Sequence, residues 1–335
     1  MEQIEHVNGA KSIKINNLLF WYHDTTQLDL ALLDFSTGFG NDGSKWTTMS
    51  PDPDYDLYSD QDLSRQMMPR IAVPDHEHWL AKDLGLSDEL KGRISLIPDE
   101  RYGAGPRQVA DLFPATRPGG PIVLFFHGGF WRTLSKDHVG HVAGPLVEGG
   151  AAVVLPGYDL CPVVSLLTVV TQAKQALLWT RQQARRLNAD PDRIYIAGNS
   201  AGAHLAAMLM MEDWTRHGLP RAPIAGAILV TGIYDLRPIP RIQVNEDVRL
   251  SAEDVVTLSP QFLPLRCRVP AIVAVGNAEP PLWIEQSRRF AAKLSATGAD
   301  VRLMELPGLH HFSITHSLSD STAPLTRALL DLVHR

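Results

Sequence analysis

The chain has 335 residues, 44% of them apolar and 20% charged, which is the balance of an ordinary globular protein long enough to bury a large core. Its net charge of −6 argues against a nucleic-acid partner or an anionic membrane surface, because both attract basic proteins. Two cysteines, Cys161 and Cys267, cannot build a disulfide framework, and no segment has the roughly 18 successive apolar residues of a membrane span. Since the first residues lack the basic start of a signal peptide, we expect a cytoplasmic protein with reduced thiols.

The composition of the chain changes near residue 49. Residues 1–48 contain none of the 23 arginines but four of the eight asparagines, and the sequence MSPDPD at 49–54 is typical of a linker. We therefore expect residues 1–48 to form an appendage and residues 49–335 to form a single domain that stays folded without it. The alternative is that the apolar residues of the appendage make it a lid or the arm of a homodimer.

From residue 94 onward, strand-like and helix-like segments alternate. Short continuous apolar runs are typical of strands buried on both faces, and longer runs of period 3.6 are typical of helices. We expect strands at 94–97, 108–113, 121–126, 151–155, 193–197, 224–230, 271–275 and 300–305, and helices at 136–148, 164–187, 201–211, 283–296 and 321–333. This alternation predicts an α/β fold, with a mostly parallel central sheet and helices on both faces.

The strongest local signal is GNSAG at 198–202, which fits the pattern G-x-S-x-G between an expected strand and an expected helix. In this setting the serine is held on a tight strand-to-helix turn, and its small neighbours let the two segments pass closely. The helix N-terminus adds free N–H groups and the positive end of a dipole beside any negative charge that develops there. The pattern predicts a nucleophilic serine at position 200.

A second signal, HGGFW at 127–131, directly follows the expected strand at 121–126. Acyl transfer to a serine needs backbone N–H donors that stabilise the oxyanion of the tetrahedral intermediate. One donor comes from the residue after the nucleophile, here Ala201, and the others come from the loop after this strand. We assign them to the N–H groups of Gly129 and Phe130.

A nucleophilic serine needs a base, and the base needs an acid that orients it. The usual chain order for such a site is serine, acid, histidine. Glu279 follows the next-to-last strand, at the end where site residues gather in open α/β sheets, and Asp235, after the preceding strand, is a rival acid. His310 or His311, after the last strand, is the expected base.

These motifs, in this order, resemble the kynurenine formamidase (arylformamidase) branch of the α/β-hydrolase superfamily, over residues 52–333. The resemblance rests on VPDHEHWL at 73–80, RYGAGPRQVADLFPA at 101–115, HGGFWRTLSK at 127–136, YDLCP at 158–162, AGNSAGAHLAAML at 197–209, TGIYDLRP at 231–238, QSRRFA at 286–291 and PGLHHF at 307–312. It implies the α/β-hydrolase fold for the catalytic domain. It also places the catalytic histidine on His311, because the family's ending is similar to Asn-His-Phe. The expected triad is therefore Ser200, Glu279 and His311.

The resemblance implies a serine hydrolase that takes a small-molecule acyl substrate, an N-acyl aryl amide, through an acyl-serine intermediate and needs no metal or cofactor. Three features depart from the family: Asn199 stands where histidine is frequent, Phe130 where tyrosine is common, and two prolines follow Glu279. They leave open a carboxylesterase or carbamate hydrolase of broad specificity. A non-enzymatic ligand-binding module on the same fold is disfavoured, because all members of the triad are present.

Three aromatic residues are candidates for the substrate pocket, with core packing as the alternative: Trp131, Trp283 and Phe312. His204, one turn into the helix after the serine, is expected to be a packed, hydrogen-bonded side chain rather than the base. His138 and His141 have the i,i+3 spacing of a metal site, but with no third ligand in view we expect them on a solvated helix face.

Overall fold

The computed structural model describes residues 53–335 continuously and, before them, five short strands. The chain divides into two compact units, residues 1–36 and residues 37–335. The first contains an antiparallel sheet of β1 (His6–Val7), β2 (Ala10–Ile15) and β3 (Leu18–Tyr22), and the second begins with the antiparallel pair β4 (Gly38–Phe39) and β5 (Lys45–Trp46). The boundary expected between residues 48 and 49 falls outside the described residues, so the division into an appendage and a catalytic domain stays a prediction.

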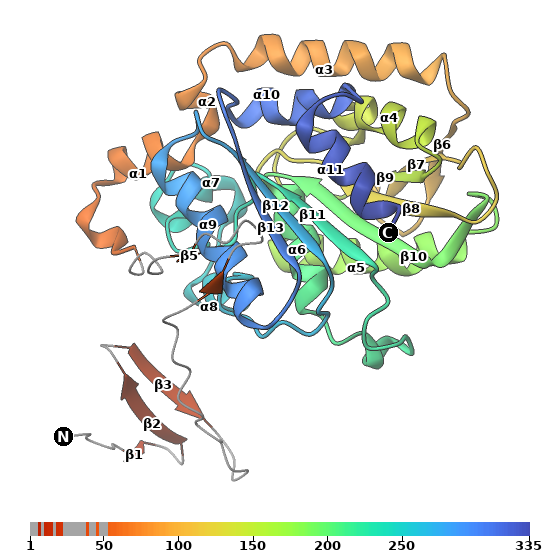
Figure 1. The fold of residues 1–335 in the computed structure, drawn as a ribbon. Coiled ribbons are helices and arrows are strands. Elements are labelled where there is room, and N and C mark those ends of the chain that lie inside the picture. Colours follow the sequence, from red (N-terminus) through yellow and green to blue (C-terminus); the bar gives the residue numbers. More distant parts are fainter. Residues whose placement is uncertain (1–5, 8–9, 16–17, 23–37, 40–44, 47–52) are drawn as a thin grey trace. The chain divides into compact units, whose positions relative to one another are not determined.

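An eight-stranded sheet forms the centre of the second unit (Figure 1). Its strands, in spatial order, are β13 (Val301–Leu306), β12 (Ala271–Gly276), β11 (Gly226–Val230), β10 (Ala189–Asn199), β8 (Gly120–Phe126), β9 (Ala152–Pro156), β7 (Val109–Phe113) and β6 (Ile97–Arg101). Neighbours from β13 to β9 are parallel, whereas β7 pairs antiparallel with β9 and β6 pairs antiparallel with β7. The mostly parallel sheet expected from the sequence is confirmed.

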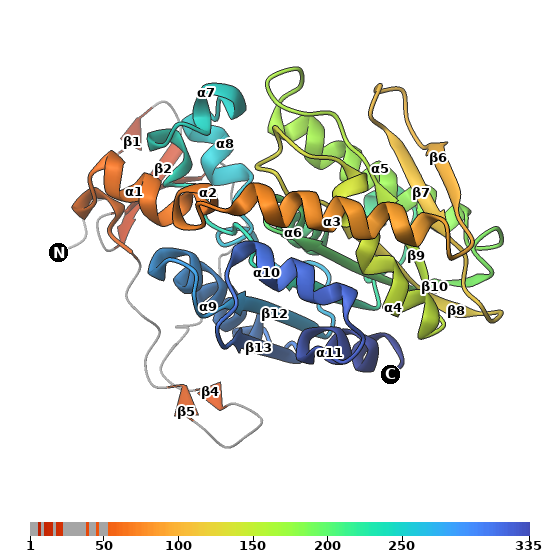
Figure 2. The ribbon, with the colours of Figure 1, turned by 90° about the horizontal axis from the view of Figure 1, so that it is seen from above.

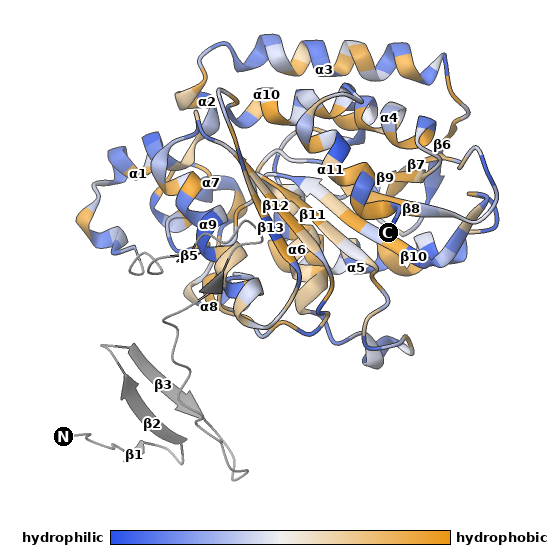
Figure 3. Ribbon diagram, viewed as in Figure 1, coloured by the Kyte–Doolittle hydropathy of each residue, from blue (hydrophilic) through white to orange (hydrophobic). Residues whose placement is uncertain are grey.

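The central strands carry continuous apolar runs because helices cover both faces of the sheet. Residues 121–126 (PIVLFF) and 271–276 (AIVAVG) are all buried, and the strands carry mainly hydrophobic colours in Figure 3. One face packs against α5 (Leu166–Gln182), α6 (Ala201–Met211) and α9 (Pro281–Ala296). The other packs against α4 (Ala143–Glu148), α10 (His311–His316) and α11 (Pro324–Val333). This arrangement brings the C-terminal ends of β8, β10, β11, β12 and β13 to one rim of the sheet.

Further helices lie outside these two layers (Figures 1 and 2). The α-helices are α1 (Asp60–Met67), α2 (Pro69–Ala72), α3 (His76–Lys91), α7 (Asn245–Val248) and α8 (Ala252–Thr257). The 3-10 helices are η1 (Tyr55–Leu57), η2 (Lys136–Val142), η3 (Trp214–His217), η4 (Ile239–Arg241) and η5 (Ser317–Ser319). Helix α3 runs along the outside of α10 and α4 in both views. Within the described part of the chain, none of the helices combines the length and the apolar character that crossing a bilayer requires.

Two elements differ from the expectation. The strand expected at 94–97 is wrong in position, because β6 spans 97–101; it is a half-exposed edge strand whose sequence, IPDER, has no apolar run. The helix expected at 136–148 is η2 followed by α4. Helix α3 was not predicted from periodicity, because its fully buried side chains, Asp83 and Ser87, are both polar.

Candidate active site

Ser200 occupies the sharp turn between β10 and α6. Its backbone has φ 56° and ψ −122°, which L-residues rarely adopt. The close approach of the helix requires glycine at 202, because a Cβ there would lie 2.0 Å from the carbonyl oxygen of Phe126 on β8. The Ser200 N–H donates to Val230 O (2.9 Å) at the end of β11. The turn that the motif predicts is therefore present, and neighbouring strands fix it on both sides.

The loop after β8 has three successive residues with left-handed backbone: Gly129 (φ 109°), Phe130 (φ 50°) and Trp131 (φ 57°). Glycine is required at 129, where a Cβ would lie 2.2 Å from Thr133 O. The N–H groups of Gly129 and Phe130 have no hydrogen-bond partner among residues 53–335. Ala201 is the first residue of α6, where an N–H has no acceptor within the helix. The assigned oxyanion donors therefore lie in a strained loop and at a helix N-terminus.

Buried aromatic contacts hold this loop in place. The His127 ring stacks on Tyr158 with centroids 4.1 Å apart, and the Tyr158 hydroxyl donates to His127 O (2.8 Å). Burial lowers the pKa of His127 to about 3, so its imidazole is neutral. Trp131 is fully buried and packs edge-on against His204, whose Nε2 lies 2.7 Å from Leu258 O. As expected, His204 is a packed, hydrogen-bonded residue, and burial lowers its pKa to about 4.

Glu279 and His311 meet just beyond the C-terminal ends of β12 and β13. His311 Nδ1 lies 2.7 Å from Glu279 Oε2, and both side chains are buried. The carboxylate accepts the Nδ1 proton, which leaves Nε2 of the neutral ring as a proton acceptor. Gly276 N–H donates to Glu279 Oε1 (3.0 Å) and fixes its second oxygen. Ser200 and His311 line the same pocket; no hydrogen bond joins them among the described contacts, as is common before a substrate binds.

The rival candidates have other partners. Asp235 is bound by Arg237 (2.6 Å) and Arg289 (3.4 Å), and it accepts a hydrogen bond from the Tyr55 hydroxyl (3.3 Å). His310 Nδ1 accepts the N–H groups of residues 312 and 313 and so caps α10. Both roles are structural. The geometry thus places Glu279 and His311, rather than Asp235 and His310, beside the pocket that contains Ser200.

A pocket that opens to solvent lies beside Ser200 and His311. Its walls are mainly apolar. They come from α2, α3, the loop after β8, η2, the residue before α7 and the start of α10, and they include Met68, Leu80, Phe130, Leu134, Val139, Val244 and Phe312. Of the three aromatic candidates, Phe312 lines the pocket. Trp131 and Trp283 take the alternative role, core packing: Trp131 is absent from the lining, and Trp283 packs edge-on against His311 with centroids 4.6 Å apart.

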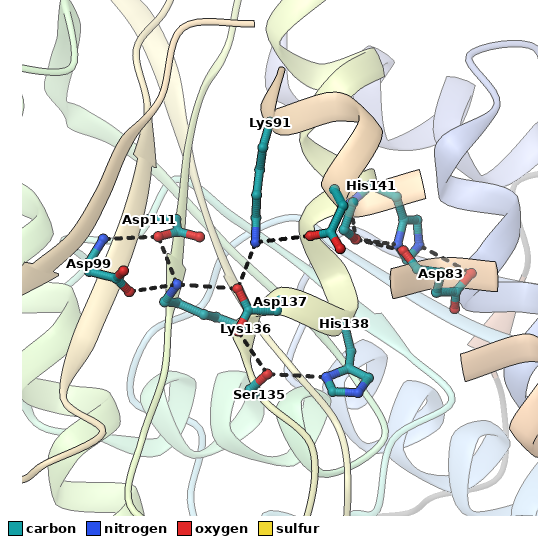
Figure 4. A network of polar contacts seen from close by, with 11 residues as sticks. Asp83, Lys91, Asp99, Asp111, Ser135, Lys136, Asp137, His138 and His141 are labelled. Atoms are coloured by element: carbon teal, nitrogen blue, oxygen red, sulfur yellow. Dashed lines mark hydrogen bonds and ion pairs between the residues drawn. The ribbon is translucent and has the colours of Figure 1, made fainter. Parts of the chain in front are cut away.

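An ionic network anchors the segment that leads away from the oxyanion loop (Figure 4). Lys136 Nζ lies 2.8 Å from Asp111 on β7 and 2.9 Å from Asp99 on β6, and Lys91 at the end of α3 binds Asp137 (2.8 Å). Burial alone would lower the pKa of Lys136, but its hydrogen bonds to Asp111 and Asp99 outweigh this and raise it. The network ties the loop after β8 to α3 and to the edge of the sheet.

The expectation for His138 and His141 is wrong for His141. It is buried rather than solvated; Ser87 Oγ accepts its backbone N–H (2.9 Å), and its Nε2 lies 3.3 Å from Thr315 O. His138 is half-buried and bonds Ser135 (3.1 Å). The reason is α3, which covers this face and was not predicted. Among the described residues there is no group of three or more His, Cys, Asp or Glu that could hold a metal ion.

Two parts of the site were not predicted from the sequence. Residues 68–83 on α2 and α3 form one wall of the pocket, and their signal was the segment at 73–80 quoted in the resemblance. Thr231, directly after β11, places its hydroxyl 2.5 Å from both carboxylate oxygens of Glu279 and 3.1 Å from His311 Nδ1. A single threonine after a strand has no motif that could reveal it.

Comparisons with known proteins agree with this architecture. Residues 123–315 match the model of an α/β-hydrolase-fold family. Kynurenine formamidase of Danio rerio is 33% identical, over 87% of this chain and 99% of its own length, and that of Salmo salar is 31% identical over the same shares. An esterase of Pyrobaculum calidifontis has the same fold, with a TM-score of 0.64 at 20% identity over 82% of this chain and 95% of the esterase.

The family match spans more than half of the chain, and the Danio rerio relative aligns over nearly its whole length. The family match, residues 123–315, includes the strand ends and loops that hold Ser200, Glu279 and His311. The chain therefore belongs to the α/β-hydrolase family and, within it, to the kynurenine formamidase-like hydrolases.

Proposed function

We propose that this hydrolase is a serine enzyme that cleaves small N-acyl aryl amides, with Ser200 as nucleophile, His311 as general base and acid, and Glu279 as the orienting carboxylate. The observation that carries the proposal is the buried His311–Glu279 pair, 2.7 Å apart, beside the pocket that Ser200 lines. The nearest competing groups, Asp235 and His310, are held in other contacts.

The reaction follows from these positions. His311 Nε2 takes the Ser200 hydroxyl proton as Oγ bonds to the substrate carbonyl carbon, and the carbonyl electron pair moves to oxygen. The N–H groups of Gly129, Phe130 and Ala201 stabilise this oxyanion. When the tetrahedral intermediate collapses, the carbon–nitrogen bond breaks and the imidazolium returns its proton to the leaving amine. Water, activated by the same imidazole, then releases the acid and restores Ser200.

The lining of the pocket supports an aromatic substrate. Its walls are mainly apolar, with Phe130 and Phe312 beside the reacting groups, and small-molecule sites are typically lined by hydrophobic and aromatic side chains. Relatives named kynurenine formamidase, 33% and 31% identical, support the amide as the scissile bond.

The second candidate is a carboxylesterase of broad specificity. Carboxylesterase NlhH of Mycobacterium tuberculosis is 27% identical over 61% of this chain, which supports this alternative. The same triad serves both activities, because an ester and an amide pass through tetrahedral intermediates of the same kind, which differ only in the leaving alcohol or amine.

A matched substrate series tests the choice. N-formylkynurenine, the formyl anilide and formyl ester of one aryl group, p-nitrophenyl esters of increasing chain length and an aryl carbamate are compared by kcat/KM. A preference for the N-formyl amides supports the proposal, and a preference for the longer p-nitrophenyl esters supports the carboxylesterase.

The Ser200→Ala variant is the control for the mechanism. Loss of a triad nucleophile typically costs about 10⁴–10⁶ in kcat, so activity on every substrate of the series should disappear while the circular dichroism spectrum is kept. A well-folded variant with more than a few per cent of the original activity would contradict a serine mechanism.

A further inference from the structure

Thr231 stands between the two partners of the candidate triad, at the end of the strand beside the one that leads to Glu279. β11 and β12 are parallel neighbours, so residue 231 emerges next to the loop that holds Glu279. Thr231 is fully buried, and its Oγ1 lies 2.5 Å from Glu279 Oε1, 2.5 Å from Oε2 and 3.1 Å from His311 Nδ1.

The chemistry of these groups decides which of them donates the hydrogen bond. An ionised carboxylate only accepts hydrogen bonds, and the hydroxyl has one proton to give. The Thr231 hydroxyl therefore donates to Glu279, whose carboxylate also accepts from Gly276 N–H and from His311 Nδ1. A carboxylate with donors on several sides is held in one orientation.

The backbone at Thr231 shows that the side chain is required. Its φ is 46°, a left-handed conformation that a β-branched residue rarely adopts and that a glycine would adopt without strain. The conformation is held on both sides, because its N–H donates to Ala274 O (2.7 Å) and its carbonyl accepts from Trp283 Nε1 (3.0 Å). A strained threonine in place of an unstrained glycine indicates that the hydroxyl has a function.

We propose that Thr231 is a positioning residue, which fixes the Glu279 carboxylate against His311 Nδ1 and so sets the orientation of the catalytic imidazole. The inference rests on the proposed function, since it assigns Thr231 a part in the same triad. Trp283 supports it from behind: its indole holds the Thr231 carbonyl, and its ring packs edge-on against His311.

The first experiment compares Thr231→Val with Thr231→Ser. Valine keeps the shape and removes the hydroxyl, whereas serine keeps the hydroxyl. We expect valine to lower kcat about 10- to 100-fold with KM nearly unchanged, the loss typical of one hydrogen bond to a charged group, and serine to stay within about threefold of the original enzyme. Labelling of Ser200 with a fluorophosphonate counts the folded sites in each preparation.

The second experiment looks for a gain of activity, so a variant that fails to fold cannot produce the expected result. Glu279→Ala removes the acid, and Thr231→Asp in that background places a carboxylate where the Thr231 hydroxyl faces His311 Nδ1. We expect the double variant to exceed Glu279→Ala at least 10-fold in kcat. A folded double variant with no gain, or a Thr231→Val enzyme as active as the original, would overturn the proposal.

The two proposals fail in different ways. If Ser200→Ala or Glu279→Ala retained full activity, the proposed triad itself would be wrong. If those variants were inactive while Thr231→Val was unaffected, or if serine at 231 was as damaging as valine, the triad would stand and the role of Thr231 alone would be refuted.

Discussion

The two ends of helix α10 carry histidine–carboxylate pairs of nearly the same geometry in different surroundings. At its first residue, His311 Nδ1 lies 2.7 Å from Glu279. At its last residue, His316 Nδ1 lies 2.6 Å from Asp83 on α3. In the first pair the histidine, His311, lines the pocket with Ser200 and the oxyanion loop. In the second pair only the carboxylate, Asp83, reaches that pocket, and His316 does not line it.

The local geometry of the two histidine–carboxylate pairs does not tell them apart. What distinguishes His311 is the convergence of strand ends, which places the serine turn, the oxyanion loop and the acid on one rim of the sheet. His316 has no such neighbours and acts as a tether. It holds α3, which in turn supplies Leu80 to the pocket wall.

The largest effect should follow from replacing the histidine at the first residue of α10 by glutamine, His311→Gln. Glutamine cannot take the serine proton, so kcat should fall by about 10⁴–10⁶. The measurement is kcat on the best substrate of the series, with thermal unfolding as the control for the fold. A folded variant with substantial activity would show that another group, such as His310, serves as base.

Glu279→Gln should reduce kcat by about 10³–10⁴, because a neutral amide no longer stabilises the imidazolium or selects its tautomer. The matched control is Asp235→Asn, which breaks a buried ionic contact with Arg237 and Arg289. That variant should lose stability, by about 3–5 kcal/mol, far more than it loses kcat. The opposite ranking in kcat would move the acid to Asp235.

At the other end of α10, His316→Gln should leave kcat on a small ester within about twofold. Its cost should appear in stability, at about 1–2 kcal/mol, since the Asp83 carboxylate loses its partner. Differential scanning calorimetry of this variant beside His311→Gln tests the contrast directly. A large fall in kcat with an unchanged melting temperature would give the second pair a part in the reaction.

His204 offers a further contrast, because it is a buried histidine whose ring contacts a backbone carbonyl, Leu258 O, in place of a carboxylate. Burial lowers the pKa of His204 to about 4, while the unfolded side chain titrates near ~6.5. Between pH ~6.5 and pH ~4 the unfolded chain binds a proton at this histidine that the folded chain does not. The free energy of unfolding is therefore unaffected by His204 above pH ~6.5 and decreases as the pH falls below it. The slope is at most about 1.4 kcal/mol per pH unit for each such group.

His204→Gln should therefore lose less stability than the original protein between pH 7 and pH 5. Urea unfolding at the two pH values measures the difference. An unchanged pH dependence in the variant would show that His204 is not the residue responsible, and His127, whose pKa burial lowers to about 3, would be the next to test.

The sequence predicted the parts of this molecule whose signal is local. The buried strands are continuous apolar runs, and Ser200 and the glycine loop sit in motifs whose strand and helix neighbours are adjacent in the chain. Helix α3 escaped prediction because its buried face is polar, with Asp83 and Ser87 inward, so it has no apolar periodicity. Thr231 was not predicted, because the side chains that it contacts, Glu279 and His311, lie 48 and 80 residues away in the chain.

The position of His311, the proposed general base, at the border of the sheet has a consequence for how activity is lost. His311 follows β13, an edge strand that pairs only with β12 within the described sheet and is less buried than the central strands. Edge elements open at lower free energy than the centre of a domain. Partial opening of this border would separate His311 from Glu279 while the central strands stay closed, so inactivation should precede global unfolding on warming.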